Sequence, residues 1–60
     1  MSESLINEMK ERISIGEQTL TQVREIIKSL KIAGEDTKTI ERQYAKTKAK
    51  IDRYKKAFNA

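Results

Sequence analysis

Residues 27–40, IKSLKIAGEDTKTI, carry the signal that decides the fold of this chain. Apolar residues at helical spacing lead up to Gly34, which suits the left-handed position that follows a helix C-terminus. Asp36 is a favourable N-cap for a second helix, because its carboxylate can accept hydrogen bonds from the first backbone N–H groups. The stretch predicts a turn between two helices, expected at about 3–32 and 37–58. A connection this short makes the helices antiparallel neighbours.

Apolar residues recur every seven positions on both sides of the turn, in two sets offset by three, which is typical of a coiled-coil seam. The first helix has its sets at Ile6, Ile13, Leu20 and Ile27 and at Met9, Gly16, Val23 and Leu30. The second helix has its sets at Thr37, Tyr44, Ile51 and Phe58 and at Ile40, Thr47 and Tyr54. In an antiparallel helix pair, the position numbers of two facing residues add up to a constant. A sum of 67 pairs the seam residues of the two helices in six layers, from Ile27 opposite Ile40 to Met9 opposite Phe58. The sequence therefore predicts an all-α, antiparallel two-helix hairpin.

Gly16 is the weak point of the first helix, since glycine inside a helix costs roughly 1 kcal/mol relative to alanine. Ser14, followed by Glu17 three residues later, also matches the capping-box pattern of a helix start. One interpretation is a break that makes three helices. The other is a continuous helix with a small residue where Ile51 or another helix needs room. The heptad phase runs through Gly16 without a shift, which favours the continuous helix.

The charges that flank the seam agree only in part with the register, since Lys10 falls near Lys55 and the two would repel. The register places Glu17 near Lys48 and Arg24 near Glu41, which we expect to form ion pairs. Exposed pairs of this kind contribute under about 1 kcal/mol each. They support the hairpin without deciding it.

The chain of 60 residues contains neither Cys nor His, which excludes a disulfide and the usual ligands of structural zinc. Domains this small bury little surface and usually gain stability from a disulfide, a metal or oligomerisation. Oligomerisation or docking on a protein partner is the route that remains. The simplest product is a homodimer that forms an antiparallel four-helix bundle.

Uncharged residues form a strip on the first helix beside the seam, at Ile15, Thr19, Gln22, Ile26, Ser29 and Ala33. In a lone hairpin this strip faces water, as scattered isoleucines often do. The alternative is a second contact face for another helix, with Gln22 hydrogen-bonded across the contact or at its wet edge. We favour the contact face, because a two-helix core is too small to outweigh conformational entropy unaided. Leu5 and Ile6 extend the face, since the first turn overhangs the second helix and needs a cover.

The second helix carries a row of cations on the face away from the seam: Arg42, Lys46, Arg53 and Lys56. Residues 37–60 hold eight basic and two acidic side chains (+6), whereas residues 1–36 hold five basic and seven acidic ones (−2). Such a row can follow phosphates, so a nucleic-acid-binding regulator is the alternative function. An acidic protein surface fits the same row, and so does a simple solvated face. No aromatic side chain is interleaved for base stacking.

Catalysis, a cofactor, a metal and a small-molecule substrate are not expected. Without His or Cys the usual bases and nucleophiles are missing, and the carboxylates of Glu8, Glu11 and Glu25 fall on solvated faces. A membrane role is disfavoured, because no apolar run nears the roughly 20 residues of a spanning helix. The opening Met-Ser-Glu-Ser segment lacks a signal-peptide pattern. We therefore expect a cytoplasmic protein.

In length, heptad helices and short turn, the chain resembles three groups of small hairpin proteins. These are dimeric plasmid-encoded RNA-binding regulators, hairpin chaperones of type III secretion systems, and hairpin phosphatases that control sporulation. The resemblance is one of shape, and the Ser-Gln-Glu-Leu-Asp segment of the sporulation family has no match here. It implies a small adaptor, regulator or assembly factor of a bacterium, phage or mobile element, acting through helix–helix contacts with itself or a protein partner.

Overall fold

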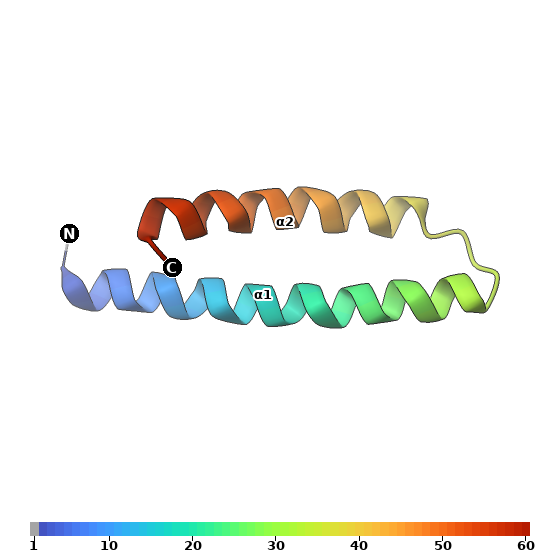
Figure 1. Cartoon of the computed structure of the whole chain (residues 1–60), viewed down its shortest axis with the longest axis horizontal. Coiled ribbons are helices and arrows are strands. Elements are labelled where there is room, and N and C mark those ends of the chain that lie inside the picture. The colour runs from blue at the N-terminus through green and yellow to red at the C-terminus, as the bar shows by residue number, and fades with distance from the viewer. Residues whose placement is uncertain (1) are drawn as a thin grey trace.

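The computed structural model describes residues 2–60, which form two helices, α1 (Glu3–Ile32) and α2 (Lys38–Phe58). The helices lie side by side and antiparallel, joined at one end by a short turn (Figure 1). The molecule is elongated, with extents of 48, 15 and 12 Å along its principal axes. The predicted antiparallel hairpin is confirmed, and each helix begins and ends within one residue of the predicted bound.

A serine cap begins α1, which then continues without a break. The Ser2 hydroxyl accepts a hydrogen bond from the Leu5 N–H at 3.2 Å, which satisfies one of the donors left free at a helix N-terminus. The helix passes through Gly16 unbroken, as the heptad phase predicted. A Cβ atom at this position would lie 2.9 Å from the Ile51 Cδ1 atom. Glycine therefore lets the helices approach closely in this layer, and the predicted register is confirmed there.

The turn is a Schellman motif with Gly34 in the left-handed conformation, at a φ of 82°. The Gly34 N–H donates to the Lys31 carbonyl at 3.0 Å, and the Glu35 N–H donates to the Leu30 carbonyl at 2.9 Å. These two bonds satisfy carbonyl groups that the end of α1 leaves without helical partners. The glycine thus ends α1 as the sequence predicted.

The start of α2 differs from the prediction by one residue. Thr37, not Asp36, occupies the N-cap position, and the Thr37 side chain makes no capping hydrogen bond. The Asp36 carboxylate still caps the helix from one residue earlier, since its Oδ1 atom accepts a hydrogen bond from the Lys38 N–H at 3.0 Å. The prediction of Asp36 as the N-cap is therefore wrong by one residue, although its carboxylate accepts a hydrogen bond from the first residue of the helix.

Seam residues supply nearly all of the buried surface. Ile13 and Ile27 are buried, as is Thr37 beside the turn. The half-buried seam residues are Ile6, Met9, Gly16, Leu20, Val23, Leu30, Ile40, Tyr44, Ile51 and Phe58. Thr47 and Tyr54 depart from the predicted seam, since both are exposed. A pair of helices covers only one face of each helix, so the edge of the seam stays open.

Candidate interaction surfaces

One flank of the seam is crossed by charged side chains, and we call it the ion-paired side; the hollow that remains there, of about 330 Å³, has a charged lining that includes Glu17, Lys48 and Lys55. Three ion pairs define it: Lys31–Glu41 at 2.8 Å, Lys55–Glu17 at 3.0 Å and Lys48–Asp52 at 3.0 Å. The first two connect α1 to α2, and the third lies within α2. Their side chains are roughly half exposed, so the pairs screen the seam from water more than they stabilise it.

The partner of Glu17 differs from the prediction. Along the helix axis, Glu17 lies between Lys48 and Lys55 of the facing helix. The ion pair forms with Lys55, not with Lys48. Side chains on a helix lean toward its N-terminus. In an antiparallel pair, Glu17 and Lys55 therefore lean toward each other, whereas Glu17 and Lys48 lean apart.

The same lean changes the partner of Glu41, which pairs with Lys31 instead of the predicted Arg24. The Thr37 hydroxyl also donates to Glu41 Oε1, at 2.7 Å. The hydrogen bond from Lys31, followed by that from Thr37, lowers the pKa of Glu41 below its ordinary value. This carboxylate therefore fastens the start of α2 to the end of α1.

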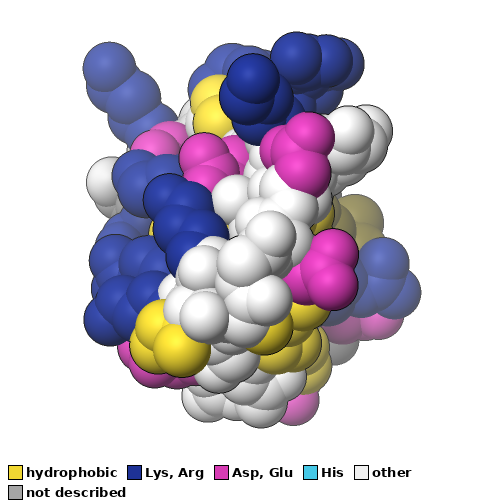
Figure 2. Space-filling view, turned by 90° about the vertical axis from the view of Figure 1, so that its right-hand side faces the viewer, with side chains coloured by type: hydrophobic (Ala, Val, Ile, Leu, Met, Phe, Trp, Pro, Cys, Tyr) yellow, Lys and Arg dark blue, Asp and Glu magenta, His cyan; other side chains and the backbone are white. Residues whose placement is uncertain are grey.

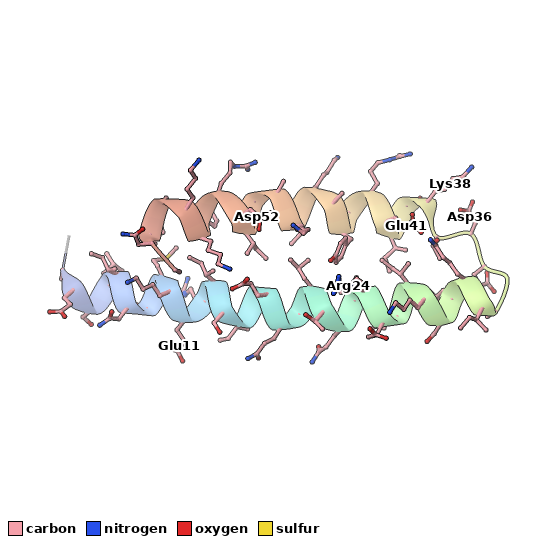
Figure 3. All side chains as sticks on the ribbon, in the orientation of Figure 1. Glu11, Arg24, Asp36, Lys38, Glu41 and Asp52 are labelled. Atoms are coloured by element: carbon pink, nitrogen blue, oxygen red, sulfur yellow. The ribbon has the colours of Figure 1, made fainter. Side chains whose placement is uncertain are left out.

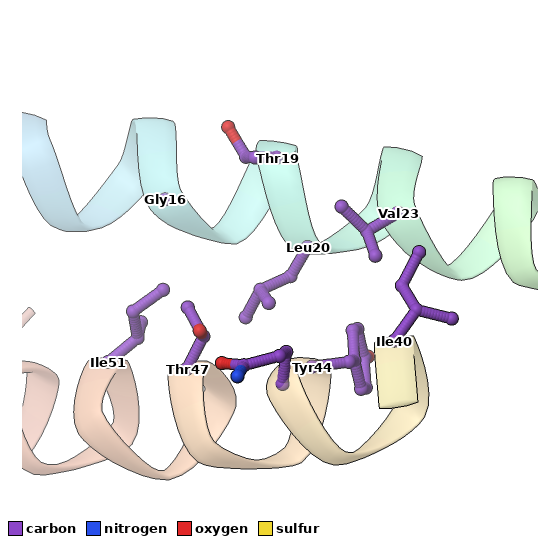
Figure 4. A pocket seen from close by; sticks show the side chains of 9 residues that line it. Gly16, Thr19, Leu20, Val23, Ile40, Tyr44, Thr47 and Ile51 are labelled. Atoms are coloured by element: carbon purple, nitrogen blue, oxygen red, sulfur yellow. The ribbon is translucent and has the colours of Figure 1, made fainter. Parts of the chain in front are cut away.

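The opposite flank carries an open groove between the helices, and we call it the uncharged side. The groove holds about 390 Å³, and none of its lining residues is charged. Figure 4 shows the lining: Gly16, Thr19, Leu20, Val23, Ile40, Gln43, Tyr44, Thr47 and Ile51. Thr19 and Gln43, the flanking residues, have short or neutral side chains that do not bridge the helices. The sequence analysis missed this groove, although the exposed seam residue Thr47 is its signal.

The predicted uncharged strip borders the groove along α1. Ile15 is 55% exposed and Ile26 is 52% exposed, and Thr19 and Gln22 are exposed as well. The Thr19 hydroxyl donates to the Ile15 carbonyl at 3.0 Å, so its hydrogen is already used within the helix. Since Thr19 belongs to both the strip and the groove, the two form one continuous uncharged surface.

The first turn of α1 has one exposed and one covered apolar residue. Leu5 is 46% exposed, as expected of an overhanging turn. Ile6 is half-buried and lines a hollow with Phe58 and Asn59. Asn59 takes the left-handed conformation, at a φ of 58°, and the C-terminal end of the chain turns toward α1 (Figure 1). The chain itself therefore partly covers Ile6, which leaves Leu5 as the more exposed side chain of the pair.

Of the large apolar residues that the structure describes, Ile32 is the most exposed, at 88%. It ends α1 beside the turn, and its heptad position lies outside both the seam and the strip. The sequence analysis did not single it out. Because it lies apart from the groove, we assign it no part in the uncharged side.

The predicted cationic row is exposed along the outer face of α2, and we call it the basic stripe: Arg42, Lys46, Arg53 and Lys56. Figure 2 shows Lys and Arg side chains gathered over α2, at the top of the view, and hydrophobic side chains exposed around α1 below it. The two carboxylates of α2, Glu41 and Asp52, are engaged by Lys31 and Lys48. Within residues 2–60, no stripe cation takes part in an ion pair.

The carboxylates on the outer face of α1 do not converge. Glu11 points away from α2 (Figure 3), Glu8 pairs with Arg12 at 3.1 Å, and Glu25 pairs with Lys28 at 3.5 Å. Among residues 2–60 there is no cluster of three acidic side chains that could hold a metal ion. Neither helix has a stretch long and apolar enough to cross a membrane.

Comparison of the chain with protein-family models, with curated proteins and with solved structures gave no match. The two exposed surfaces described above therefore carry the functional argument.

Proposed function

We propose that this chain is a non-catalytic interaction protein, an adaptor, regulator or assembly factor that works by packing its uncharged side against other helices. The supporting observation is that the exposed strip and the uncharged groove lie together on one side of the seam. The other side is already occupied by the molecule's own ion pairs. A helix that docks over the groove would cover no charged lining residue there. The next hollow along this flank is lined in part by Arg12 and Lys50, so the uncharged contact is limited to the groove and the strip.

The exposed area of the chain supports docking. Its accessible surface is 4944 Å², whereas a folded monomer of 6.9 kDa exposes about 4,000 Å². The excess is about 900 Å² by this scaling, close to the roughly 800 Å² that each partner buries in a standard interface. One docked partner of ordinary size would bring the exposed area to the value expected for the mass.

The small core supports the same proposal. Among residues 2–60, only Ile13 and Ile27 are buried apolar residues, and α2 contributes no buried residue. Full burial of an isoleucine contributes about 1.5–3 kcal/mol. Ile15 and Ile26 are each about half exposed, so covering both in an interface would add about that much apolar burial to this small core. Two hairpins joined by their uncharged sides would form an antiparallel four-helix bundle.

Sedimentation of the wild-type chain and two charge variants tests this proposal. We expect a dimer at micromolar concentration, and Ile26→Glu raises the dissociation constant at least tenfold because it buries a carboxylate. Gln18→Glu adds the same charge on the outer face of α1 and serves as the matched control, with an unchanged constant. A wild-type chain that is monomeric and fully helical at micromolar concentration would refute self-association.

A second candidate function is nucleic-acid binding by the basic stripe. It is favoured by the absence of ion pairs at the stripe, since every carboxylate of α2 is engaged elsewhere. Four phosphate contacts give a slope of log affinity against log salt of about −3 to −4. Replacing all four stripe cations by Glu should abolish binding to duplex RNA or DNA, whereas reversing Lys10, Arg12, Arg24 and Lys28 on α1 is the matched control. Binding that survives the stripe variant would exclude this function, and binding to polyglutamate but to neither duplex would assign the stripe to an acidic protein.

A further inference from the structure

The first four residues of the uncharged strip, from Ile15 to Ile26, form a pattern that is the same in both chain directions; Ser29 and Ala33 lie beyond this symmetric part. Its apolar residues, Ile15 and Ile26, stand at the outside, and its polar residues, Thr19 and Gln22, stand at the centre. The steps between them are four, three and four residues. Two identical helices packed antiparallel present facing positions with a constant sum. A strip with this symmetry can therefore pair with a second copy of itself so that apolar residues face apolar residues and polar residues face polar ones.

We infer that the partner of the uncharged side is a second copy of this chain whose α1 packs antiparallel on the first. The two-fold axis crosses α1 between Leu20 and Thr21. Ile15 then meets the partner's Ile26, and Thr19 meets the partner's Gln22. This inference rests on the proposed function and adds the identity of the partner, its direction and its register.

The position of the groove agrees with this axis. Its lining on α1 runs from Gly16 to Val23, and the proposed axis passes through the middle of that span. The groove of each copy therefore opens onto the groove of the other at the centre of the dimer. A closed two-fold dimer requires such a self-complementary patch around its axis.

The polar centre of the strip is also matched in hydrogen bonding. Gln22 needs a partner when it is covered, because an unpaired buried amide costs about 1–3 kcal/mol. The Thr19 hydroxyl has donated its hydrogen to the Ile15 carbonyl at 3.0 Å and keeps lone pairs that accept. The Gln22 amide can thus donate to the partner's Thr19. Because of the two-fold axis this bond is made twice.

Along α1, charge favours this arrangement over the packing of α1 on the partner's α2, while the cations of each α2 then lie beside the partner's α2. The α2 positions that correspond to the strip hold Lys46, Lys50 and Arg53. With the hairpins crossed in that way, Arg12 would face the partner's Arg53, and the strip would cover lysines. In the α1–α1 arrangement Arg12 faces the partner's Ser29, and its guanidinium remains paired with Glu8. No like charges then meet along α1.

Disulfide trapping tests the register, because the natural chain has no Cys. Ile15→Cys mixed with Ile26→Cys should form a disulfide between the two variants at least ten times faster than either variant does with itself. Self-pairs lie roughly 16 Å apart along the helix axis at 1.5 Å per residue, beyond the reach of a disulfide. Gln18→Cys on the outer face, mixed with either variant, is the control and should not cross-link.

A charge exchange checks the same pairing without a covalent bond. A chain with Ile15→Glu and Ile26→Lys places opposite charges across the contact, and a chain with Ile15→Glu and Ile26→Glu places like charges there. We expect the first to dimerise at least tenfold more tightly than the second, by a margin that shrinks with salt. Wild-type dimers that give neither the mixed disulfide nor this difference would overturn the register and leave the proposed function standing. A monomeric wild-type chain would overturn both.

Discussion

The ion-paired side and the uncharged side flank the same seam, and they differ in the residues next to it. On the ion-paired side, Lys31 and Lys55 reach across to carboxylates at 2.8 and 3.0 Å, and their aliphatic stems cover the apolar residues beneath. On the uncharged side, Thr19 and Gln43 do not bridge the helices, and an open groove remains. Both sides retain a hollow, but the one on the ion-paired side is lined by charged side chains, whereas the groove is lined by uncharged ones and is available for apolar packing.

Of the three substitutions that test this difference between the two sides, one that fills the groove from α2 should change the free energy of unfolding most. Thr47→Leu adds apolar atoms opposite Leu20, and each buried methylene contributes about 0.8 kcal/mol, with a further gain in helix propensity. We expect the free energy of unfolding to rise by about 1–2 kcal/mol, measured by urea denaturation at fixed chain concentration. Thr21→Leu, which is exposed on α1 outside this groove, is the control for helix propensity; it also removes the hydroxyl that donates to the Glu17 carbonyl at 3.2 Å. Equal gains from the two variants would mean that the groove is not packing space.

The close approach at Gly16 should give an intermediate effect. Gly16→Ala improves helix propensity by about 1 kcal/mol, but its Cβ would lie 2.9 Å from Ile51 Cδ1, so we expect less than half of that gain. In an Ile51→Val background the Cδ1 atom is absent, and the full gain should appear. A double-mutant cycle by thermal or urea unfolding measures the difference. Additive effects would contradict the close contact between the helices.

The smallest effect on stability is expected on the ion-paired side, where the contribution of Glu41 should depend on pH. Its pKa is lowered in the folded chain by the Lys31 and Thr37 hydrogen bonds. The stabilisation is therefore complete above the pKa of the unfolded chain and is lost as the pH falls through the lower folded pKa. Melting temperatures of wild type and Glu41→Gln should differ at neutral pH and converge in acid. Glu11→Gln, on the outer face of α1, is the control, and a difference that persists in acid would contradict the mechanism.

The hairpin could be predicted from the sequence because periodicity, a glycine and a cap residue all report the same local geometry. The heptad phase predicted the unbroken helix through Gly16, and Gly34 predicted the turn. The partners of Glu17 and Glu41 could not be predicted, since spacing fixes the face of a residue but not the direction in which its side chain leans. The exposure of Thr47 and Tyr54 also escaped, because heptad positions do not tell how many helices surround a seam.

The candidate site was predictable only in part. The exposure of Ile15, Thr19, Gln22 and Ile26 followed from their place beside the seam. The groove did not, because it depends on short or neutral side chains from two helices meeting at one level. Ile6 was expected to need a cover from another molecule, whereas the C-terminal turn at Asn59 supplies part of that cover.

The Schellman turn at Gly34 also has a kinetic consequence. The loop that it closes is short, so the chain entropy lost when the first seam layers meet is small. Pairs next to the turn, such as Ile27 with Ile40, form first, and each later layer adds to a helix pair that already exists. Folding by such zippering depends on near neighbours in the chain, which is the condition for folding on the microsecond to millisecond scale. We therefore expect the layers around Met9 and Phe58 to form last and to open first.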